Sequence, residues 1–262
     1  MRIQLTTKDE IRRRDRMRAG ILAGHPFGPG RLRERWHVGG RSGSLRAAIF
    51  GVSDGLVSNL ALILGVAGSG VSARVVVIAG VAGLLAGAFS MGTGEYLSMR
   101  VQREVFEHAL EVEAMEIELL PEAEIEELSG IYQSKGIPAD TALAVAKALM
   151  EKPSQALDVH AREELGLDPS QLGSPWGAAG SSFVTFSVGA FVPLLPYLLS
   201  SGSTAFAGAL VAGAAALGLV GGFMAHMTAR SIWRGGVRML SLGTITAAAT
   251  FGVGSLFNVA VG

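Results

Sequence analysis

Hydrophobic residues are gathered along the chain into five long runs, and a polar segment separates each run from the next. The runs cover approximately residues 47–68, 75–97, 177–199, 204–227 and 238–260. Each has the roughly 20 apolar residues that an α-helix needs to cross a bilayer core. None alternates with the period of two that marks a barrel strand. Buried helices of a soluble bundle are the alternative, but such bundles rarely contain five uninterrupted runs. The pattern therefore predicts an all-α membrane protein with five transmembrane helices.

Lys and Arg lie almost entirely in three polar segments, 1–46, 98–176 and 228–238, with Arg74 as the exception. These segments are alternate connections, so they share one side of the membrane, and excess positive charge favours the cytoplasmic side. Five spans then place the N-terminus in the cytoplasm and the C-terminus outside. The expected organisation is a basic cytoplasmic arm at 1–46, two spans at 47–97, a cytoplasmic helical metal-binding insert at 98–176 and three spans at 177–262.

Composition excludes several kinds of chemistry. The 262 residues carry no net charge and no cysteine, which excludes disulfides, thiolate metal sites and Cys nucleophiles. No nucleophile–base pair or complete catalytic metal site stands out, so neither an enzyme nor a prosthetic group is expected. The arm is expected to lie on anionic headgroups rather than on nucleic acid. Its arginines are Arg12, Arg13, Arg14, Arg16 and Arg18.

The insert begins with a dense acidic stretch. Ten Glu lie between Glu104 and Glu127, and this stretch contains no Lys or Arg. Like charges three or four positions apart on a helix repel each other by a few tenths of a kcal/mol. A solvated acidic surface is one interpretation, although such a surface would normally include lysines. The other is a carboxylate cluster that divalent cations neutralise, because oxygen ligands suit hard or borderline ions.

The second span is expected to continue into the insert as one helix, because no proline occurs between Arg74 and Pro121. At about 100° per residue, one face of that helix carries Met91, Glu95, Glu113 and Glu116. This stripe would connect a metal site within the membrane, at Met91 and Glu95, to a metal-collecting site in the cytoplasm, at Glu113 and Glu116. Three shorter helices are expected to follow at about 122–134, 139–151 and 154–165.

Asp54 lies within the first span, with no Lys or Arg within seven residues on either side. An ionisable group in a span is costly and is by default a functional site that faces the bundle interior. A structural hydrogen-bond acceptor or helix cap is the alternative. Met91 and Glu95 in the second span offer a thioether and a carboxylate, which suit Fe²⁺ or a similar ion. Exchange of metal against protons on the same carboxylates would let a proton gradient drive metal out of the cytoplasm.

Four stretches in this order resemble the vacuolar iron transporter family. They are GVSDGLVSNLALILGVAG, AGVAGLLAGAFSMGTGEYLS, LLPEAEIEEL and KPSQALDVHAREELGL. The likeness extends over about residues 44–262. It implies a five-span homodimer that exports cytosolic Fe²⁺, and often Mn²⁺, in exchange for protons. Both metals are then bound and transported ions rather than prosthetic groups. For a bacterial homologue the resemblance implies the inner membrane.

The resemblance also assigns residues to a metal path. Asp54 and Met91 match the membrane positions of that path. The matching cytoplasmic metal ligands are Glu113, Glu116, Glu124, Glu127 and Glu164. Together these residues would collect metal on the cytoplasmic side and pass it through the membrane.

The chain departs from the plant-type members of the family at two places. Gly83 stands where they carry a Glu in the second span, and Glu95 is the candidate substitute. His160 and Ala161 stand where they carry paired Met. His160 can still ligate Fe²⁺ through its imidazole, whereas Ala161 cannot ligate at all.

The sequence thus predicts a proton-coupled transporter that moves Fe²⁺, and also Mn²⁺, out of the cytoplasm. The competing class is a membrane-anchored metal sensor or buffer, which binds iron without transporting it. Asp54 separates the two, because a buffer gains nothing from a carboxylate within a span.

Overall fold

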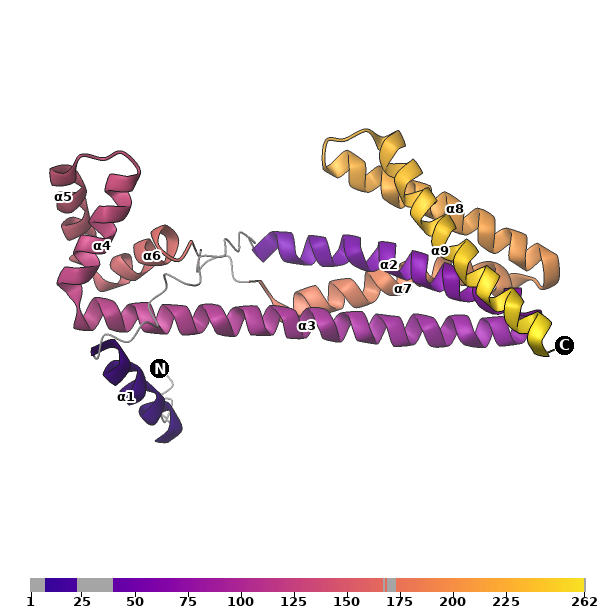
Figure 1. Cartoon of the computed structure of the whole chain (residues 1–262), viewed down its shortest axis with the longest axis horizontal. Helices are drawn as coiled ribbons and strands as arrows, with labels where there is room; N and C mark the ends of the chain where they lie inside the picture. The colour runs from indigo at the N-terminus through magenta and orange to yellow at the C-terminus, as the bar shows by residue number, and fades with distance from the viewer. Residues whose placement is uncertain (1–7, 23–39, 167, 169–172, 262) are drawn as a thin grey trace. The chain divides into compact units, whose positions relative to one another are not determined.

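A computed structural model of the chain describes residues 8–22, 40–166, 168 and 173–261 (Figure 1). Within these residues all regular secondary structure is α-helical, as the hydrophobic pattern predicts. The helices are α1 Lys8–Leu22, α2 Gly40–Gly68, α3 Ala73–Leu119, α4 Pro121–Ser134, α5 Ala139–Met150, α6 Pro153–Glu163, α7 Pro175–Leu199, α8 Gly202–Met227 and α9 Ile232–Val261.

The five expected spans are confirmed as helices. Those long and apolar enough to cross a membrane are Ser44–Gly68, Ala73–Leu119, Pro175–Leu199, Gly202–Met227 and Ile232–Phe257. Large apolar side chains cover their outer surfaces; Leu219, for example, is 74% exposed and Leu256 is 70% exposed. Apolar surface on this scale suits lipid rather than water.

The chain divides into two compact units. The membrane unit consists of Gly40–Arg100 and Gly173–Gly262, and the other unit contains α1 and Val101–Leu172. The part Val101–Leu172 is called the insert below. Helix α3 contributes to both units.

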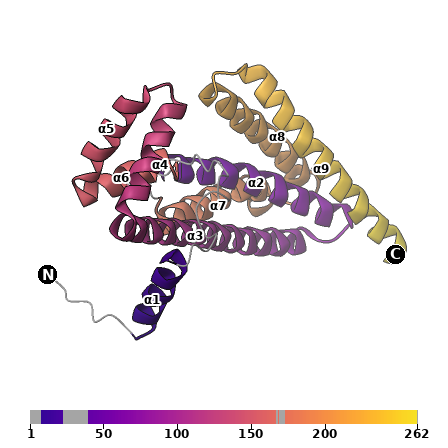
Figure 2. The ribbon, with the colours of Figure 1, turned by 60° about the vertical axis from the view of Figure 1, so that its left-hand side comes forward.

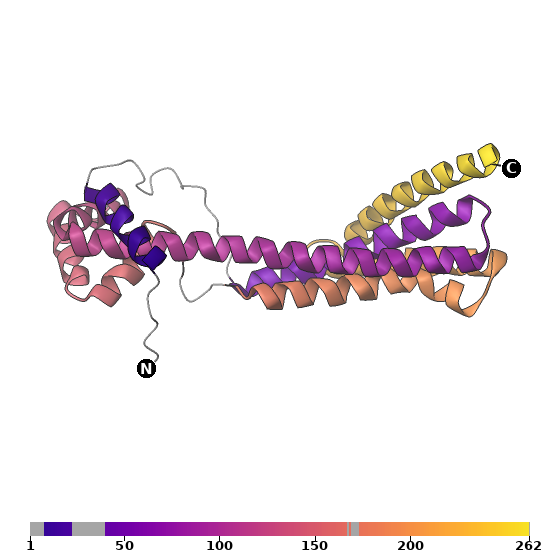
Figure 3. The ribbon, with the colours of Figure 1, turned by 90° about the horizontal axis from the view of Figure 1, so that it is seen from below.

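Helix α3 is one unbroken helix of 47 residues (Figure 3). At 1.5 Å per residue it is about 70 Å long, more than twice the thickness of a bilayer core of about 30 Å. The expected continuation of the second span as one helix is therefore confirmed. The helix ends just before Pro121, because proline disfavours helical backbone in the residue that precedes it.

The membrane unit is built around α2, which packs against α7, α8 and α9. Helices α8 and α9 also lie side by side (Figure 2). A stripe of Leu56, Leu60 and Leu64 on α2 forms a buried cluster with Leu217 of α8 and Ala247 of α9. Glycines bring α2 and α7 unusually close. A Cβ atom at Gly189 would overlap the backbone carbonyl of Val52, and one at Gly55 would overlap that of Phe186.

We therefore expect Gly189→Ala to destabilise the membrane unit. The added methyl group meets backbone rather than a flexible side chain, so α7 must move away from α2, at a cost of about 1–3 kcal/mol. Thermal unfolding of the detergent-solubilised chain measures the effect as a lower midpoint. Gly94→Ala is the matched control, because apart from the adjoining backbone of its own helix no described atom lies within 4 Å of its added Cβ. Equal midpoints for the two variants would contradict the close packing.

Helices α4, α5 and α6 begin and end within two residues of the expected bounds. Pro121 and Pro153 occupy the first position of α4 and α6, where the missing backbone N–H costs nothing. The core of the insert is small and largely made of alanine, with Leu128 as its largest apolar member.

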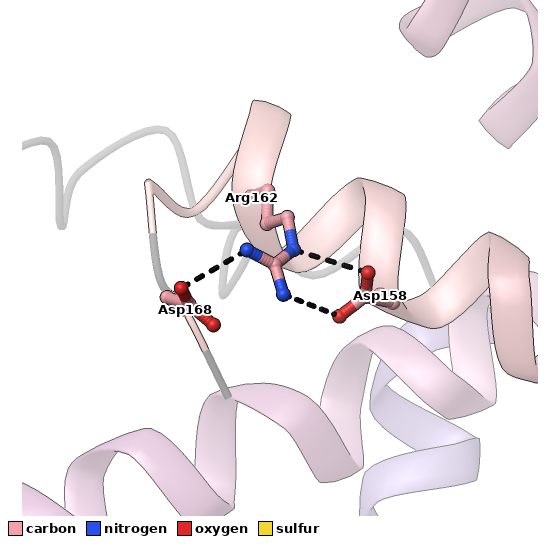
Figure 4. A network of polar contacts seen from close by, with 3 residues as sticks. All are labelled: Asp158, Arg162 and Asp168. Carbon is pink, nitrogen blue, oxygen red and sulfur yellow. Dashed lines mark hydrogen bonds and ion pairs between the residues drawn. The ribbon is translucent and has the colours of Figure 1, made fainter. Parts of the chain in front are cut away.

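A polar network follows at the end of α6. Arg162 of α6 donates to both carboxylate oxygens of Asp158 and forms a 3.0 Å ion pair with Asp168 (Figure 4). This ion pair holds Asp168 against the end of α6.

Candidate metal centre

Three carboxylates and one imidazole converge inside the insert. Glu113 comes from α3, Glu124 from α4, His160 from α6, and Glu164 from the residue that follows α6. Each offers one ligand atom, and the four atoms lie within 4.8 Å of one another. We call these four residues the Glu–His cluster. The sequence places them far apart, and only the packing of three helices brings them together.

The geometry of the Glu–His cluster is centred on Nδ1 of His160. This atom lies 3.0 Å from Glu113 Oε1, 3.4 Å from Glu124 Oε2 and 3.5 Å from Glu164 Oε2. His160 is 0% exposed and Glu113 is 1% exposed. Neither His160 nitrogen nor Glu113 Oε1 has a partner with hydrogen-bond geometry among the described residues. Buried polar atoms without partners are costly, and a cation at this point would satisfy several of them at once.

Two further glutamates adjoin the cluster. Burial raises the pKa of Glu116 to about 7, and repulsion from Glu113, Glu164 and Glu127 adds to the effect. Burial also raises the pKa of Glu127, followed by repulsion from Glu164. Since such repulsion is strong only between nearby charges, Glu116 and Glu127 lie close to the cluster. All six metal ligands expected from the sequence therefore lie in one region of the insert.

The cluster holds protons when no cation is bound. Burial, followed by repulsion from Glu113, raises the pKa of Glu124 to about 8. Burial lowers the pKa of His160, but contacts with Glu113 and Glu164 outweigh it and raise that pKa to about 10. The imidazolium and the protonated carboxyl groups then offset the crowded negative charge. A divalent cation must displace these protons in order to bind.

Metal affinity of the insert is accordingly expected to rise with pH between 6 and 8. Glu116 and Glu124 must lose their protons to act as ligands, and pKa values of about 7 and 8 place this loss in that range. Each proton displaced steepens the rise by up to about tenfold per pH unit. Calorimetric titration of Mn²⁺ into the full chain, in two buffers of different ionisation enthalpy, measures both the affinity and the protons released. An affinity that is independent of pH, with no proton release, would contradict the assignment.

A second group of polar residues lies in the membrane unit, where three helices line an open pocket of about 250 Å³. Its lining residues are Asp54, Ser58, Asn59 and Leu62 of α2, Gly83, Gly87, Ser90 and Met91 of α3, and Phe186 of α7. Asp54 is exposed in the single chain, so its carboxylate is open to a bound ion. The structure thus brings together Asp54 and Met91, two of the three residues expected on the membrane path.

Glu95, the third of these residues, lies elsewhere. Among the described residues it does not line the pocket; its Oε2 lies 3.9 Å from a guanidinium nitrogen of Arg46. Gly83 does line the pocket, and Glu95 is twelve positions further along the helix. That separation is about 18 Å and about 120° around the axis. Glu95 therefore does not take the place of a side chain at Gly83. Arg46 was not expected at this site, and no sequence pattern connects it to Glu95.

Five long apolar helices define an integral membrane protein, and its candidate metal-binding groups lie in the Glu–His cluster of the insert and in a pocket lined by three of the long helices. The chain belongs to the VIT family, which it matches over residues 45–255. The family resemblance of the four sequence motifs is therefore confirmed.

Curated relatives resemble the chain over most of its length. "Vacuolar iron transporter" of Acanthamoeba castellanii is 37% identical over 225 residues, which cover 83% of this chain and 80% of the relative. "Vacuolar iron transporter 1" of Arabidopsis thaliana is 33% identical over 208 residues, 79% of this chain and 83% of the relative. "Vacuolar iron transporter homolog 1" of Oryza sativa subsp. japonica is 31% identical over 217 residues, 82% of this chain and 74% of the relative.

Proposed function

We propose that this protein transports divalent metal, Fe²⁺ and also Mn²⁺, out of the cytoplasm in exchange for protons. Membership of the VIT family supports metal-ion transport and is consistent with a protein that is not an enzyme. The metal is cargo in this proposal, and no prosthetic group is required.

The observation that carries the proposal is the presence of two separate groups of metal-suited ligands in one chain. The Glu–His cluster lies in the insert, and the Asp54–Met91 pocket lies among helices long enough to cross a membrane. A sensor or buffer needs only the first group. A carboxylate among apolar spans is expensive, and an ion that passes the membrane gives it a use.

The insert would collect the metal on the cytoplasmic side of the membrane. The proposed ligands are Glu113, Glu116, Glu124, Glu127, Glu164 and His160. Carboxylate oxygens with one imidazole suit Fe²⁺ and Mn²⁺. Since metal must displace protons from this cluster, uptake from the cytoplasm would be linked to pH at the first step.

The membrane path would then use Asp54, Met91 and Glu95. Asp54 supplies a charged oxygen, and the Met91 thioether favours softer transition metals over Mg²⁺ and Ca²⁺. Glu95 contributes a buried oxygen without a hydrogen bond among the described residues, on the same helix as Met91. The opening of the pocket beside Asp54 would be covered by a second copy of the chain in a homodimer.

The distribution of basic residues supports an orientation with the N-terminus in the cytoplasm and the C-terminus outside. The insert then lies in the cytoplasm, between the second and third spans. We place the protein in a bacterial inner membrane, in contact with lipid and not with nucleic acid. Within the N-terminal arm, residues 8–22 form α1, where Arg18 pairs with Glu118 of α3 at 3.0 Å, and residues 40–46 form the start of α2. The other residues of the arm, 1–7 and 23–39, lie outside the described residues.

Uptake into proteoliposomes tests the proposal. With an acidic lumen and metal outside, vesicles that carry the chain should accumulate Fe²⁺ and Mn²⁺ faster than vesicles without a pH gradient, while protons leave the lumen. Metal that binds to the chain but never enters the lumen would establish a sensor or buffer. Uptake that is unaffected by the gradient would remove the proton coupling.

A further inference from the structure

One polar side chain in the membrane pocket has an unused acceptor. Asn59 of α2 is 2% exposed, and its Nδ2 donates a 2.7 Å hydrogen bond to the backbone carbonyl of Ala190 in α7. Its Oδ1 is buried and has no hydrogen-bond partner among the described residues. By contrast, the neighbouring Ser58 hydroxyl already donates to the Asp54 carbonyl at 2.6 Å.

The hydrogen bond to Ala190 fixes which end of the amide is oxygen. A backbone carbonyl can only accept, so the atom beside it must be the NH₂ group of Asn59. The remaining atom is therefore an acceptor and cannot exchange places with the NH₂ group without breaking that bond. A cation is attracted by the oxygen and repelled by the NH₂ group, so the bond also holds the amide in the orientation that suits a cation.

The free oxygen faces α3 at a position without a side chain. A Cβ atom at Gly83 would lie 2.9 Å from Asn59 Oδ1, and Gly83 and Asn59 both line the pocket with Asp54 and Met91. The same Cβ would overlap Cδ2 of Leu62, so the end of this flexible side chain occupies the space beside the oxygen, and a cation that reaches the oxygen must displace it. A buried carbonyl without a partner is destabilising, and among apolar helices few groups other than a cation or its water can satisfy it.

We propose that Asn59 Oδ1 is a neutral ligand for the divalent cation in this pocket, together with the Asp54 carboxylate. The proposal rests on the transport function above and adds a residue to its membrane path. An amide oxygen contributes no charge, so the pocket holds the ion with one carboxylate and releases it more readily than a carboxylate-rich site. A hard oxygen at this place also favours Mn²⁺ and Fe²⁺ over soft ions such as Cd²⁺.

Exchange of the oxygen for sulfur tests the proposal, because the chain contains no cysteine. Asn59→Cys introduces a single soft ligand at the site. In proteoliposomes we expect Mn²⁺ uptake to fall about tenfold, while Cd²⁺ uptake is retained or increases. In detergent, Cd²⁺ should give the ultraviolet charge-transfer absorption of a cadmium–thiolate bond. The matched control is Ser182→Cys, since Ser182 is 0% exposed and its hydroxyl has no hydrogen-bond partner in the described part of the chain, but it lies outside the pocket.

Two results would overturn the role of Asn59. One is an equal change in Mn²⁺ and Cd²⁺ uptake, which a purely structural amide would produce. The other is the absence of the cadmium–thiolate band in Asn59→Cys, or a band of equal strength in the control. The band does not depend on transport. If the unmodified chain moves no metal, the transport function fails, and the band still decides whether the side chain at position 59 contacts a bound ion.

Discussion

Replacement of Asp54 by Asn is expected to lower metal uptake into proteoliposomes by about 100-fold, the upper end of the loss that follows even from removing a group that supports a metal ligand. The substitution keeps the shape of the side chain and removes its charge. Asp54 is the one carboxylate that lines the described membrane pocket, so no other acidic group there can replace it. Initial rates of Fe²⁺ and Mn²⁺ uptake under an imposed pH gradient measure the effect.

Metal binding to the insert provides an internal reference for this variant. Asp54→Asn should bind Mn²⁺ at the Glu–His cluster with unchanged affinity, because Asp54 and the cluster belong to different units. Ser58→Ala is the matched control in the pocket, since the Ser58 hydroxyl already donates to backbone; its uptake should remain close to that of the unmodified chain. Normal uptake by Asp54→Asn would remove the pocket from the metal path.

The second large effect is expected from Glu113→Gln in the insert. Glu113 is 1% exposed and lies closer to His160 than the other carboxylates of the cluster. Loss of this charge should lower the affinity of the full chain for Mn²⁺ by about 100-fold. Uptake should fall at low metal concentration and recover at saturating metal, because the membrane pocket is unchanged. Calorimetric titration and the concentration dependence of uptake measure the two effects.

A titration of His160 separates a ligand role from a loss of fold. The contact with Glu113 supports the raised pKa of this imidazole, so Glu113→Gln should lower that pKa, as measured by NMR. Glu122→Gln is the matched control, because Glu122 belongs to the same acidic stretch but is exposed. If Glu122→Gln weakened binding as much as Glu113→Gln, the acidic stretch would act as a diffuse charged surface rather than as a site.

Together the two variants separate collection from passage. A variant in the insert should change the metal concentration at which uptake is half-maximal, and one in the pocket should change the maximal rate. The same change for both would mean that they act through one step.

Much of the architecture could be predicted from the sequence because it depends on local rules. A run of about 20 apolar residues is long enough to span a bilayer wherever it occurs, and all five runs became helices. The absence of proline between Arg74 and Pro121 was sufficient to predict that α3 continues to Leu119. The short helices of the insert were placed to within two residues by Pro121, Gly136, Pro153 and Gly166.

The ligand sets could be predicted only in part. The acidic stretch indicated metal chemistry because it contains many Glu and no Lys or Arg, and Asp54 indicated it because an ionisable group within a span is costly. The roles of Glu124, Glu164 and His160, by contrast, came from the family resemblance. Helical periodicity placed Met91 and Glu95 on one face of α3. It could not show that Met91 lines a pocket with Asp54 while Glu95 lies beside Arg46.

What the sequence determined by itself is the five spans, the short helices of the insert and the residue types on each face, because hydrogen bonding and burial act between near neighbours along the chain. Only the tertiary structure decided which faces meet. Glycines bring α2 against α7 and place Asn59 beside Ala190, 131 residues away. The packing of α3, α4 and α6 encloses His160 among three carboxylates. Such contacts arise from the fit of surfaces between distant segments, and periodicity along one helix does not specify its partner.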